Sequence, residues 1–521
     1  MKKRNLQRIF AAFMATAMAV TAAGCAKKDE PKPATDNNDT QTAATEAPKA
    51  TEAPKTDDSA KGEESTPEPT KEEAAAPVVD VPEGQFYCVL NDDGIWVDQY
   101  GETIDLGGMN IIVRDWWSTG RKTENLTAYD EAQYAYWDEV QDLYNFTIDS
   151  QTIGDWGTVP QDFVDYATLP DDGNNYVFTL RADAAVTSAM NNGLMYDLTQ
   201  LKALDFSQEK FQLNKLHEQY AKGSASYCMF AGPSEPRTGV YFNIQVLKDA
   251  GIDPNEIYDL QASGQWTWDK FDEYMGKVQR DLDSDGVDDV FGLTINEGVM
   301  TDQAIFSNGG SYIGKDANGY YYNLESPQTQ EALNWCVEMY NKYDQHDPEG
   351  AQWDYYKEEF LSGVVGFMVE QEYAAMGDGN FLAPMEGNIG FVMFPKGPSY
   401  DNYINVWDNN PVAIPANYDS FKAGQLAFAW NLYTDPVPGF EDYNSRIVDA
   451  SLNGKFDDRA KNETIPMMVS AEHGTVAYHG LIPDLNLGPD LTWSVVANAD
   501  ISALTEAIRD TWKAYVDAAN K

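Results

Sequence analysis

Between residues 109 and 180, short apolar runs alternate with stretches whose apolar residues recur at helical spacing. The runs at 109–113, 146–148 and 176–180 are typical of buried strands, and the segments 130–144 and 160–169 have the periodicity of helices that face a core. Strands that alternate with helices form parallel sheets covered on both faces. The alternation therefore predicts an α/β fold, in which ligands bind beyond the carboxyl ends of the strands.

Aromatic and charged side chains follow each of these three predicted strands. In chain order they are Asp115, Trp116, Trp117, Trp156, Arg181 and Asp183. Aromatic rings pack on the C–H faces of a sugar, and charged groups hydrogen-bond to its hydroxyls, so the pattern favours a carbohydrate site. Alternation along an extended chain turns one of the two neighbouring tryptophans inward and the other outward, and leaves open which of them faces the ligand.

The charge of the chain excludes several kinds of partner. Its 36 basic and 84 acidic residues give a net charge of −48, which leaves no basic surface for nucleic acid or for anionic lipid. Hydrophobic residues make up 43% of the 521, enough for large cores in two or three domains. The four cysteines include no CxxC pair and the four histidines no HExxH motif, so neither common zinc motif is present.

The first 24 residues have the pattern of an export signal. A basic start is followed by an apolar stretch at 9–23, which is too short to span a bilayer comfortably. The stretch ends in AAGC at 22–25, which resembles the processing site of bacterial lipoproteins. That resemblance implies cleavage before Cys25 and a diacylglyceryl group on its thiol. The alternative is ordinary signal-peptidase cleavage beside an incidental cysteine.

Residues 25–82 are predicted to form a disordered tether between this anchor and a globular body. The segment 26–82 contains no aromatic residue and repeats ATEAPK at 44–49 and 50–55. Such a composition cannot bury enough apolar surface to offset the entropy lost on ordering.

Ordered motifs further along the chain resemble one protein family. They are GVYFN at 239–243, VLKDAGI at 246–252, WTWDKF at 266–271, FSNGG at 306–310, FLSGVVGFM at 360–368, IGFVMFPKGP at 389–398 and an amphipathic helix pattern at 503–518. Together they resemble the family 1 extracellular solute-binding proteins of ABC importers, the maltose-binding-protein-like group, which mostly serve carbohydrates. The likeness spans residues 107–521 and is weakest at 436–491. The ordered set of motifs is more specific to the family than any one motif alone.

The resemblance implies a type II periplasmic-binding-protein-like clamshell of two α/β lobes, each a sheet flanked by helices. The first lobe would comprise residues 83–240 and 391–435, and the second 241–390 and 436–521. Such a protein is a monomer and not an enzyme. It would hold a carbohydrate between its lobes at the outer face of the bacterial cytoplasmic membrane and deliver it to the permease subunits of an ABC importer.

Further candidate ligand residues follow from the same resemblance, from their position before a predicted strand, or from their charge. They are Arg237, Asn308, Tyr373, Trp407 and Asp408. Two of these have a structural alternative, since Tyr373 could pack inside the second lobe and Trp407 could pack against the hinge. The sequence does not name the sugar.

An acidic loop at 281–289 has the spacing of a calcium site. Carboxylates stand at loop positions 1, 3, 5 and 9, with glycine at position 6 and a backbone carbonyl available at position 7. The predicted ligands are Asp281, Asp283, Asp285, Val287 and Asp289. Position 12 is Gly292, where an EF-hand has a bidentate glutamate. The alternative is a solvated acidic turn.

A secreted carbohydrate-active hydrolase is the alternative function. It would also be rich in aromatic and acidic residues, and the sequence cannot exclude the pair of carboxylates that glycoside hydrolysis needs. However, the chain has no GxSxG, Walker A or zinc-hydrolase motif. A surface adhesion protein would predict internal repeats, and none occurs in the globular part.

Overall fold

The computed structural model describes residues 80–521 except 125, 236, 345–349, 377–379, 408, 443–453 and 498. The side chains of Ala184 and Glu297 are also not described. The predicted signal peptide, Cys25 and nearly all of the predicted tether lie outside the described residues, as does Asp408. Everything that follows concerns the compact unit of residues 74–521.

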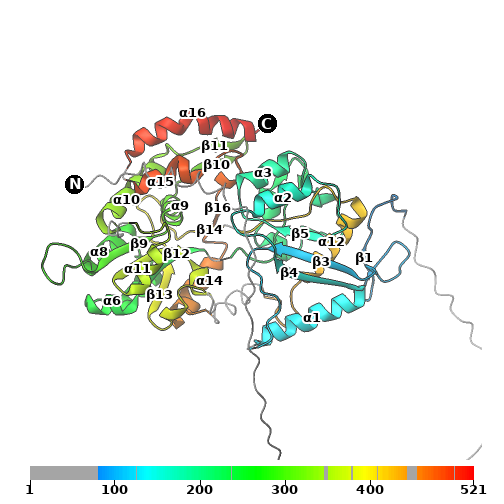
Figure 1. Cartoon of the computed structure of the whole chain (residues 1–521), viewed down its shortest axis with the longest axis horizontal. Coiled ribbons are helices and arrows are strands. Elements are labelled where there is room, and N and C mark those ends of the chain that lie inside the picture. Colours follow the sequence, from blue (N-terminus) through cyan, green and yellow to red (C-terminus); the bar gives the residue numbers. More distant parts are fainter. Residues whose placement is uncertain are drawn as a thin grey trace, which may run out of the picture. The chain divides into compact units, whose positions relative to one another are not determined.

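The first sheet contains the three strands that the alternating pattern predicts (Figure 1). Its strands in spatial order are β15 (Val412–Ala413), β5 (Tyr176–Thr179), β3 (Met109–Asp115) and β4 (Phe146–Thr152). β3 runs parallel to both β4 and β5, and the short β15 is antiparallel to β5. The predicted parallel sheet is therefore confirmed, with one antiparallel strand added at its edge.

Helices cover both faces of this sheet. They are α1 (Ala128–Tyr144), α2 (Val159–Ala167), α3 (Ala184–Asn191) and α12 (Ser420–Tyr433). In β5, Val177 packs with α1 and α12, whereas the next residue, Phe178, packs with α2 and α3. Successive side chains of a strand point to opposite faces, so one short apolar strand serves two cores. α1 begins at a capping box between Thr127 and Asp130 and ends at Asn145, whose φ is 52°.

The second sheet has mixed strand directions. Its strands in spatial order are β13 (Ile389–Met393), β8 (Thr238–Asn243), β12 (Val365–Gln371) and β9 (Phe291–Ile295). β9 and β12 are parallel, while β8 is antiparallel to both of its neighbours. The main helices of this half are α6 (Ile244–Asp249), α7 (Pro254–Ala262), α8 (Trp268–Val278), α9 (Glu297–Ser307), α10 (Pro327–Tyr343), α11 (Tyr356–Ser362) and α16 (Ile501–Ala519).

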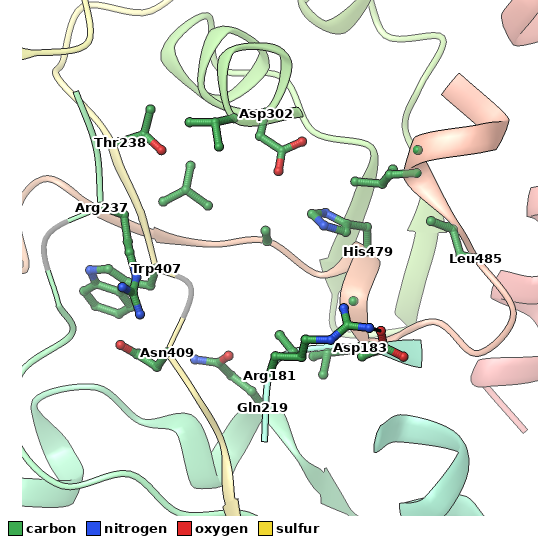
Figure 2. A pocket seen from close by; sticks show the side chains of 18 of the residues that line it. Arg181, Asp183, Gln219, Arg237, Thr238, Asp302, Trp407, Asn409, His479 and Leu485 are labelled. Carbon is green, nitrogen blue, oxygen red and sulfur yellow. Dashed lines mark ion pairs between the residues drawn. The ribbon is translucent and has the colours of Figure 1, made fainter. Parts of the chain in front are cut away.

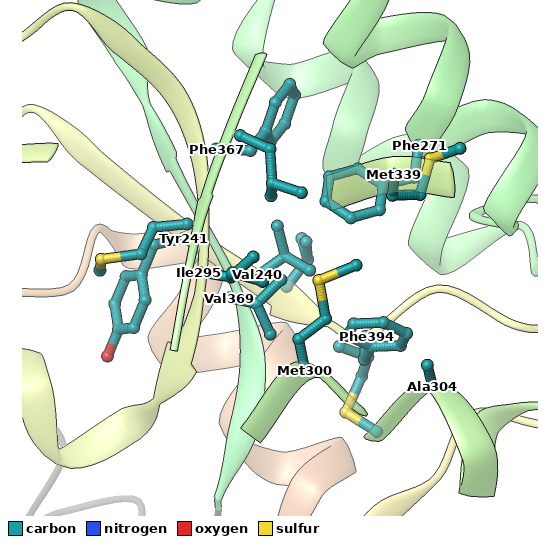
Figure 3. Close-up of a cluster of buried hydrophobic side chains, with 14 of the residues drawn as sticks. Val240, Tyr241, Phe271, Ile295, Met300, Ala304, Met339, Phe367, Val369 and Phe394 are labelled. Carbon is teal, nitrogen blue, oxygen red and sulfur yellow. The ribbon is translucent and has the colours of Figure 1, made fainter. Parts of the chain in front are cut away.

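A large apolar core holds the second sheet against its helices (Figure 3). Val240 and Tyr241 of β8 point to opposite faces of the sheet, as neighbours in a strand must. Val240 lies on the face that Phe271 of α8 and Met339 of α10 cover. Every residue of β8 is buried, which explains why its centre, residues 239–242, is a continuous run without charged or strongly polar side chains.

The chain passes between the two sheets at points slightly different from those expected. β8 begins at Thr238, and all five residues of β13 pair with it. The expected return to the first lobe at Phe391 is therefore wrong, because that residue lies in the middle of a strand that belongs to the second sheet. The chain leaves this sheet after Met393, forms β14 (Asn405–Trp407), and joins the first sheet only at β15.

The remaining elements are short. β1 (Val89–Leu90) and β2 (Trp96–Val97) form an antiparallel hairpin. The others are α4 (Glu209–Gln212), α5 (Leu216–Gln219), β6 (Ala221–Lys222), β7 (Ala225–Ser226), β10 (Ile313–Asp316), β11 (Gly319–Tyr322), α14 (Ile465–Val469), β16 (Gly474–Val476) and α15 (Trp493–Val496). No helix among the described residues has the length and apolar character that crossing a membrane requires.

Candidate ligand-binding site

A cavity of about 520 Å³ lies between segments that belong to both sheets (Figure 2). The end of β5, the start of β8, helix α9, the end of β14 and the segment 477–488 all contribute to it. The side chains that line it and carry polar groups include Arg181, Asp183, Gln219, Arg237, Asp302, Gln303, Trp407, Asn409, His479, Asp484 and Asn486. In Figure 2, Asp302 lies across the cavity from Arg181 and Asp183.

Arg181 and Asp183 come from the turn between β5 and α3. Their side chains form an ion pair of 2.8 Å. Asp183 is also the N-cap of α3 and accepts a hydrogen bond of 2.7 Å from the backbone N–H of Ala185. The guanidinium of Arg181 lies 4.5 Å from the ring centroid of Trp156, whose side chain is 61% exposed. An aromatic face thus stands at the edge of the cavity, supported by a paired cation.

Arg237 lies just before β8, where the chain enters the second sheet. Its guanidinium is 2.6 Å from Glu235 and 4.0 Å from Glu372. Its backbone N–H donates to Oδ1 of Asn405, a residue of β14, at 3.0 Å. Burial raises the pKa of Glu372 to about 8, and the nearby Arg237 opposes that shift. A cluster of charged side chains therefore borders the cavity, at a point where the chain passes from one sheet to the other.

Several residues that line the cavity carry buried polar atoms without hydrogen-bond partners among the described residues, and Nε of Arg181 is one of them. The side chain of Gln303 donates to the backbone carbonyl of Ile404 at 2.5 Å, and its Oε1 has no partner. Nε1 of Trp407 also has none. Burying such groups unpaired costs about 1–3 kcal/mol each, which proteins tolerate mainly at functional sites.

The indole of Trp407 has its position fixed by a glycine. A Cβ at Gly474, in the partner strand β16, would lie 2.1 Å from atoms of the Trp407 ring. Only glycine leaves room for the indole to lie flat against this strand.

The structure places four of the sequence-predicted ligand residues at the cavity and a fifth beside it. Arg181, Asp183, Arg237 and Trp407 line it, and Trp156 lies on Arg181. Asp408 lies outside the described residues.

Two predicted residues at the end of β3, Asp115 and Trp116, have structural roles instead. Asp115 is buried and does not line the cavity, because its carboxylate accepts hydrogen bonds from the backbone N–H groups of Trp117 and Ser118. Trp116 packs on the apolar cluster beneath α2 and α3, whereas Trp117 is 52% exposed. Trp117 is therefore the tryptophan that faces outward, and Trp116 faces inward.

The expectation that Asn308 contacts the ligand is wrong in this structure. Its side chain is fully buried. Its amide donates to the backbone carbonyl of Gln328 and to Glu331, both at 2.9 Å, and its oxygen accepts from the backbone N–H of Ser399 at 2.9 Å. The residue joins the end of α9 to the turn after β13. Tyr373 is 40% exposed and is not among the residues that line the cavity.

The acidic loop has its carboxylates gathered as a hard cation would require. Ligand oxygens of Asp281, Asp283 and Asp285, all exposed, lie within 4.8 Å of one another. Asp289 accepts a hydrogen bond from the backbone N–H of Leu282 at 2.8 Å, which turns its carboxylate toward the start of the loop. A hydrogen bond from the backbone of Gly286 is the main cause that lowers the pKa of Asp281. An all-oxygen donor set of this kind fits calcium.

Comparison with known proteins identifies a family. Residues 177–432 match the family described as bacterial extracellular solute-binding protein. No protein of curated function matches the chain in sequence. The fold class and the family resemblance inferred from the sequence motifs are both confirmed.

Solved structures with the same fold cover most of the chain. UgpB from Mycobacterium tuberculosis in complex with glycerophosphocholine has a TM-score of 0.54 at 16% identity, covering 78% of this chain and 98% of its own. The cyclic α-maltosyl-1,6-maltose binding protein from Arthrobacter globiformis has a TM-score of 0.54 at 13% identity, covering 80% and 100%. The GacH receptor of Streptomyces glaucescens has a TM-score of 0.52 at 12% identity, covering 79% and 99%.

Proposed function

Because residues 177–432 match the family of bacterial extracellular solute-binding proteins, we propose that the chain is a member of it that captures a carbohydrate and delivers it to an ABC importer. The cavity between the two sheets is the proposed binding site. Structures of similar fold include a cyclic maltosyl-maltose binding protein and the GacH receptor in complex with acarbose, which supports a sugar as the ligand.

The observation that carries this proposal is the pairing of the cationic side chains at the cavity. Arg181 is paired with Asp183 and Arg237 with Glu235, so neither cation brings an uncompensated positive charge that would select an anion. A guanidinium has five N–H donors, and a carboxylate has several acceptor sites. Paired groups of this kind suit a neutral ligand with many hydroxyls, each of which both donates and accepts.

The exposed tryptophans support a ligand of more than one sugar unit. The loops that carry Trp117 and Trp156 are hydrogen-bonded to each other, since Ile153 N–H donates to the carbonyl of Asp115 at 2.9 Å. Both rings are more than half exposed, and Trp156 lies on Arg181 at the cavity. Sugar rings beyond the cavity would stack on these aromatic faces.

A hydrolase is the less favoured function. The family and the similar structures are those of binding proteins. At the cavity, Asp183 is held by Arg181 and by the helix cap, and Asp302 accepts a hydrogen bond of 2.5 Å from Tyr312. Both carboxylates already have partners, which disfavours them as the acid and nucleophile pair of a glycoside hydrolase.

The location and the partners of the protein form part of the same proposal. The signal pattern and Cys25 support a lipid anchor that keeps the chain at the outer face of the cytoplasmic membrane. The protein would act as a monomer that docks to the permease subunits. The acidic loop of Asp281, Asp283, Asp285, Val287 and Asp289 would hold a structural calcium ion. The gathered oxygens of the first three of these residues support it.

Calorimetry with the mature protein tests the binding function. Maltose, maltotriose and acarbose are titrated in turn, and each sample is analysed by chromatography afterwards. We expect one molecule of at least one sugar to bind per chain and to be recovered unchanged. Shortened products would favour the hydrolase, and the absence of binding across a wider glycan panel would refute a carbohydrate ligand.

A further inference from the structure

A buried glutamate stands behind the cavity and faces Arg237. The two carboxylates near this arginine differ in setting, since the side chain of Glu235 is 43% exposed and that of Glu372 only 10%. The guanidinium of Arg237 lies 2.6 Å from the carboxylate of Glu235 and 4.0 Å from that of Glu372. The arginine that lines the cavity thus has one exposed partner on its own segment and one buried neighbour on another segment.

The backbone of Glu372 is tied to the second sheet. Its N–H donates to the carbonyl of Arg237 at 2.9 Å, and its own carbonyl accepts from the hydroxyl of Tyr241 at 2.9 Å. The preceding residue, Gln371, is paired with Thr238 in the ladder between β12 and β8. The distance between the Glu372 carboxyl and the Arg237 guanidinium can therefore change mainly through movement of the two side chains.

The carboxyl of Glu372 is only partly satisfied in this arrangement. Its Oε2 is buried and has no hydrogen-bond partner among the described residues. Glu370, two residues earlier on β12, is equally buried, but its carboxylate accepts hydrogen bonds from Tyr356, Asn296 and the backbone of Gln371. The two neighbouring glutamates thus differ in two respects: the carboxylate of Glu370 is hydrogen-bonded, and only the carboxyl of Glu372 faces Arg237.

The charge of Glu372 can change near neutral pH. Burial raises its pKa to about 8, Arg237 lowers it and Glu235 raises it further. The phenol groups of Tyr241 and Tyr373 are further titratable groups that interact with this carboxyl, and Glu370 acts on the same two phenols. Both have their own pKa values raised by burial and stay neutral at physiological pH.

We propose that Glu372 positions Arg237, leaving the guanidinium at the cavity with Glu235 when its carboxyl is protonated and drawing it toward β12 when its carboxyl is ionised. The attraction across 4.0 Å of buried space arises only in the ionised state. Ligand affinity is therefore highest when Glu372 is neutral and falls as it ionises. This inference rests on the proposed function of the cavity as a solute site. It means that pH regulates the affinity of that site for its ligand.

Calorimetric titration of maltotriose at a series of pH values tests the inference. For the wild-type protein we expect affinity to fall about three- to tenfold between about pH 7 and about pH 9.5, the scale of one ion pair. Glu372→Gln keeps the side chain neutral and should abolish the fall. Glu370→Gln is the matched control and should retain it. A flat wild-type profile, or an equal fall in Glu372→Gln, overturns the proposal.

A second measurement needs no ligand and separates this inference from the proposed function. A carboxyl whose pKa is raised on folding binds more protons in the folded state, so its contribution to stability decreases from about pH 4.3 to about pH 8 and is constant above that. Urea unfolding of the wild type should show this decrease relative to Glu372→Gln. In Arg237→Gln, which removes the group that lowers the pKa, the decrease should extend to higher pH.

The two measurements can fail independently, and each failure refutes a different claim. If Arg237→Gln leaves the unfolding profile unmoved, Arg237 and Glu372 are not coupled and the inference is wrong whatever the ligand. If this coupling is present but maltotriose does not bind at any pH, the glycan that binds best in the wider panel replaces it, and the absence of any binding glycan refutes the proposed function.

Discussion

Trp156 is the residue whose contribution to affinity is most open to measurement. Its ring is largely exposed and lies on the guanidinium of Arg181, so it is available to a ligand. We expect Trp156→Ala to weaken sugar binding by about 1–3 kcal/mol with little change in stability, as for truncation of an aromatic anchor. Calorimetry and thermal unfolding measure the two effects separately.

The control for this change is Trp353→Ala. Trp353 is 81% exposed, lies against Lys357 and does not line the cavity. Its removal should leave affinity unchanged. Equal losses in the two variants would show that exposed tryptophans affect binding in a general way, and the role of Trp156 would then be refuted.

Asn308 should show the opposite behaviour. Its amide group satisfies the backbone N–H of Ser399 and the carbonyl of Gln328, and both would lose their partner in Asn308→Ala. We expect a loss of about 1–3 kcal/mol in unfolding free energy for each buried group left unpaired. Urea unfolding measures this loss, and calorimetry should find the affinity of the folded protein unchanged. A selective loss of affinity would restore Asn308 as a ligand residue.

These residues also show what sequence reasoning could reach. Arg181 and Asp183 were predictable because they follow a strand whose position the apolar pattern gives. Asn308 was not, because its motif reveals a turn but not whether the amide points to solvent or to backbone. Gln303 and His479 had no usable signal, since one lies on a helix face and the other in the segment where the family motifs are weakest.

At the scale of elements, the first sheet was predictable and the passage between sheets was less so. The strands at 109–113, 146–148 and 176–180 all occur, because alternating strand and helix patterns leave few other folds open. β13 was recognised as a strand, but the sheet to which it belongs depends on its pairing with β8, some 150 residues earlier in the chain. Local patterns carry no information on such pairing.

The acidic loop provides a test at the same scale. An ion that binds only the folded protein stabilises it by mass action, by about 2.7 kcal/mol at a concentration a hundred times the Kd. We expect calcium to raise the Tm of the wild-type protein, and the double change Asp283→Ala and Asp285→Ala to abolish that rise. Asp316→Asn, at the end of β10, is the control. A melting curve that neither calcium nor a chelator moves would leave the loop as an acidic turn.

At the scale of the whole molecule, the anchor is predicted from a segment far from the binding site. If Cys25 carries a lipid, the mature protein should partition with the membrane, because acyl chains bury many CH₂ groups at about 0.8 kcal/mol each. We expect Cys25→Ala to release the protein into the medium or to leave its signal uncleaved. Cell fractionation and intact-mass measurement of the product distinguish these cases, and a normally processed, membrane-bound variant would refute the anchor.

The last prediction concerns closure of the two halves around the ligand. The cavity is lined by segments of both sheets, so a sugar bound there contacts both and stabilises the conformation in which they are closest. Spin labels on cysteines introduced at Glu139 of α1 and Glu338 of α10, both exposed positions, report the separation of the two halves. The labelled protein also carries Cys25→Ala, so that Cys25 takes up no label. The three other cysteines are buried and should not react.

We expect the bound sugar to shorten the mean distance between these two labels and to narrow the distribution of distances. A ligand shifts such an equilibrium only as far as its affinities for the two conformations differ, so the closed fraction should rise with sugar concentration and reach a plateau. A pair of labels at Glu131 and Glu139, both on α1, should give a distance that sugar does not change. If calorimetry shows the sugar to be bound while the distance between α1 and α10 stays constant, binding does not depend on closure, and the permease would have to recognise the ligand-bound state by some other feature.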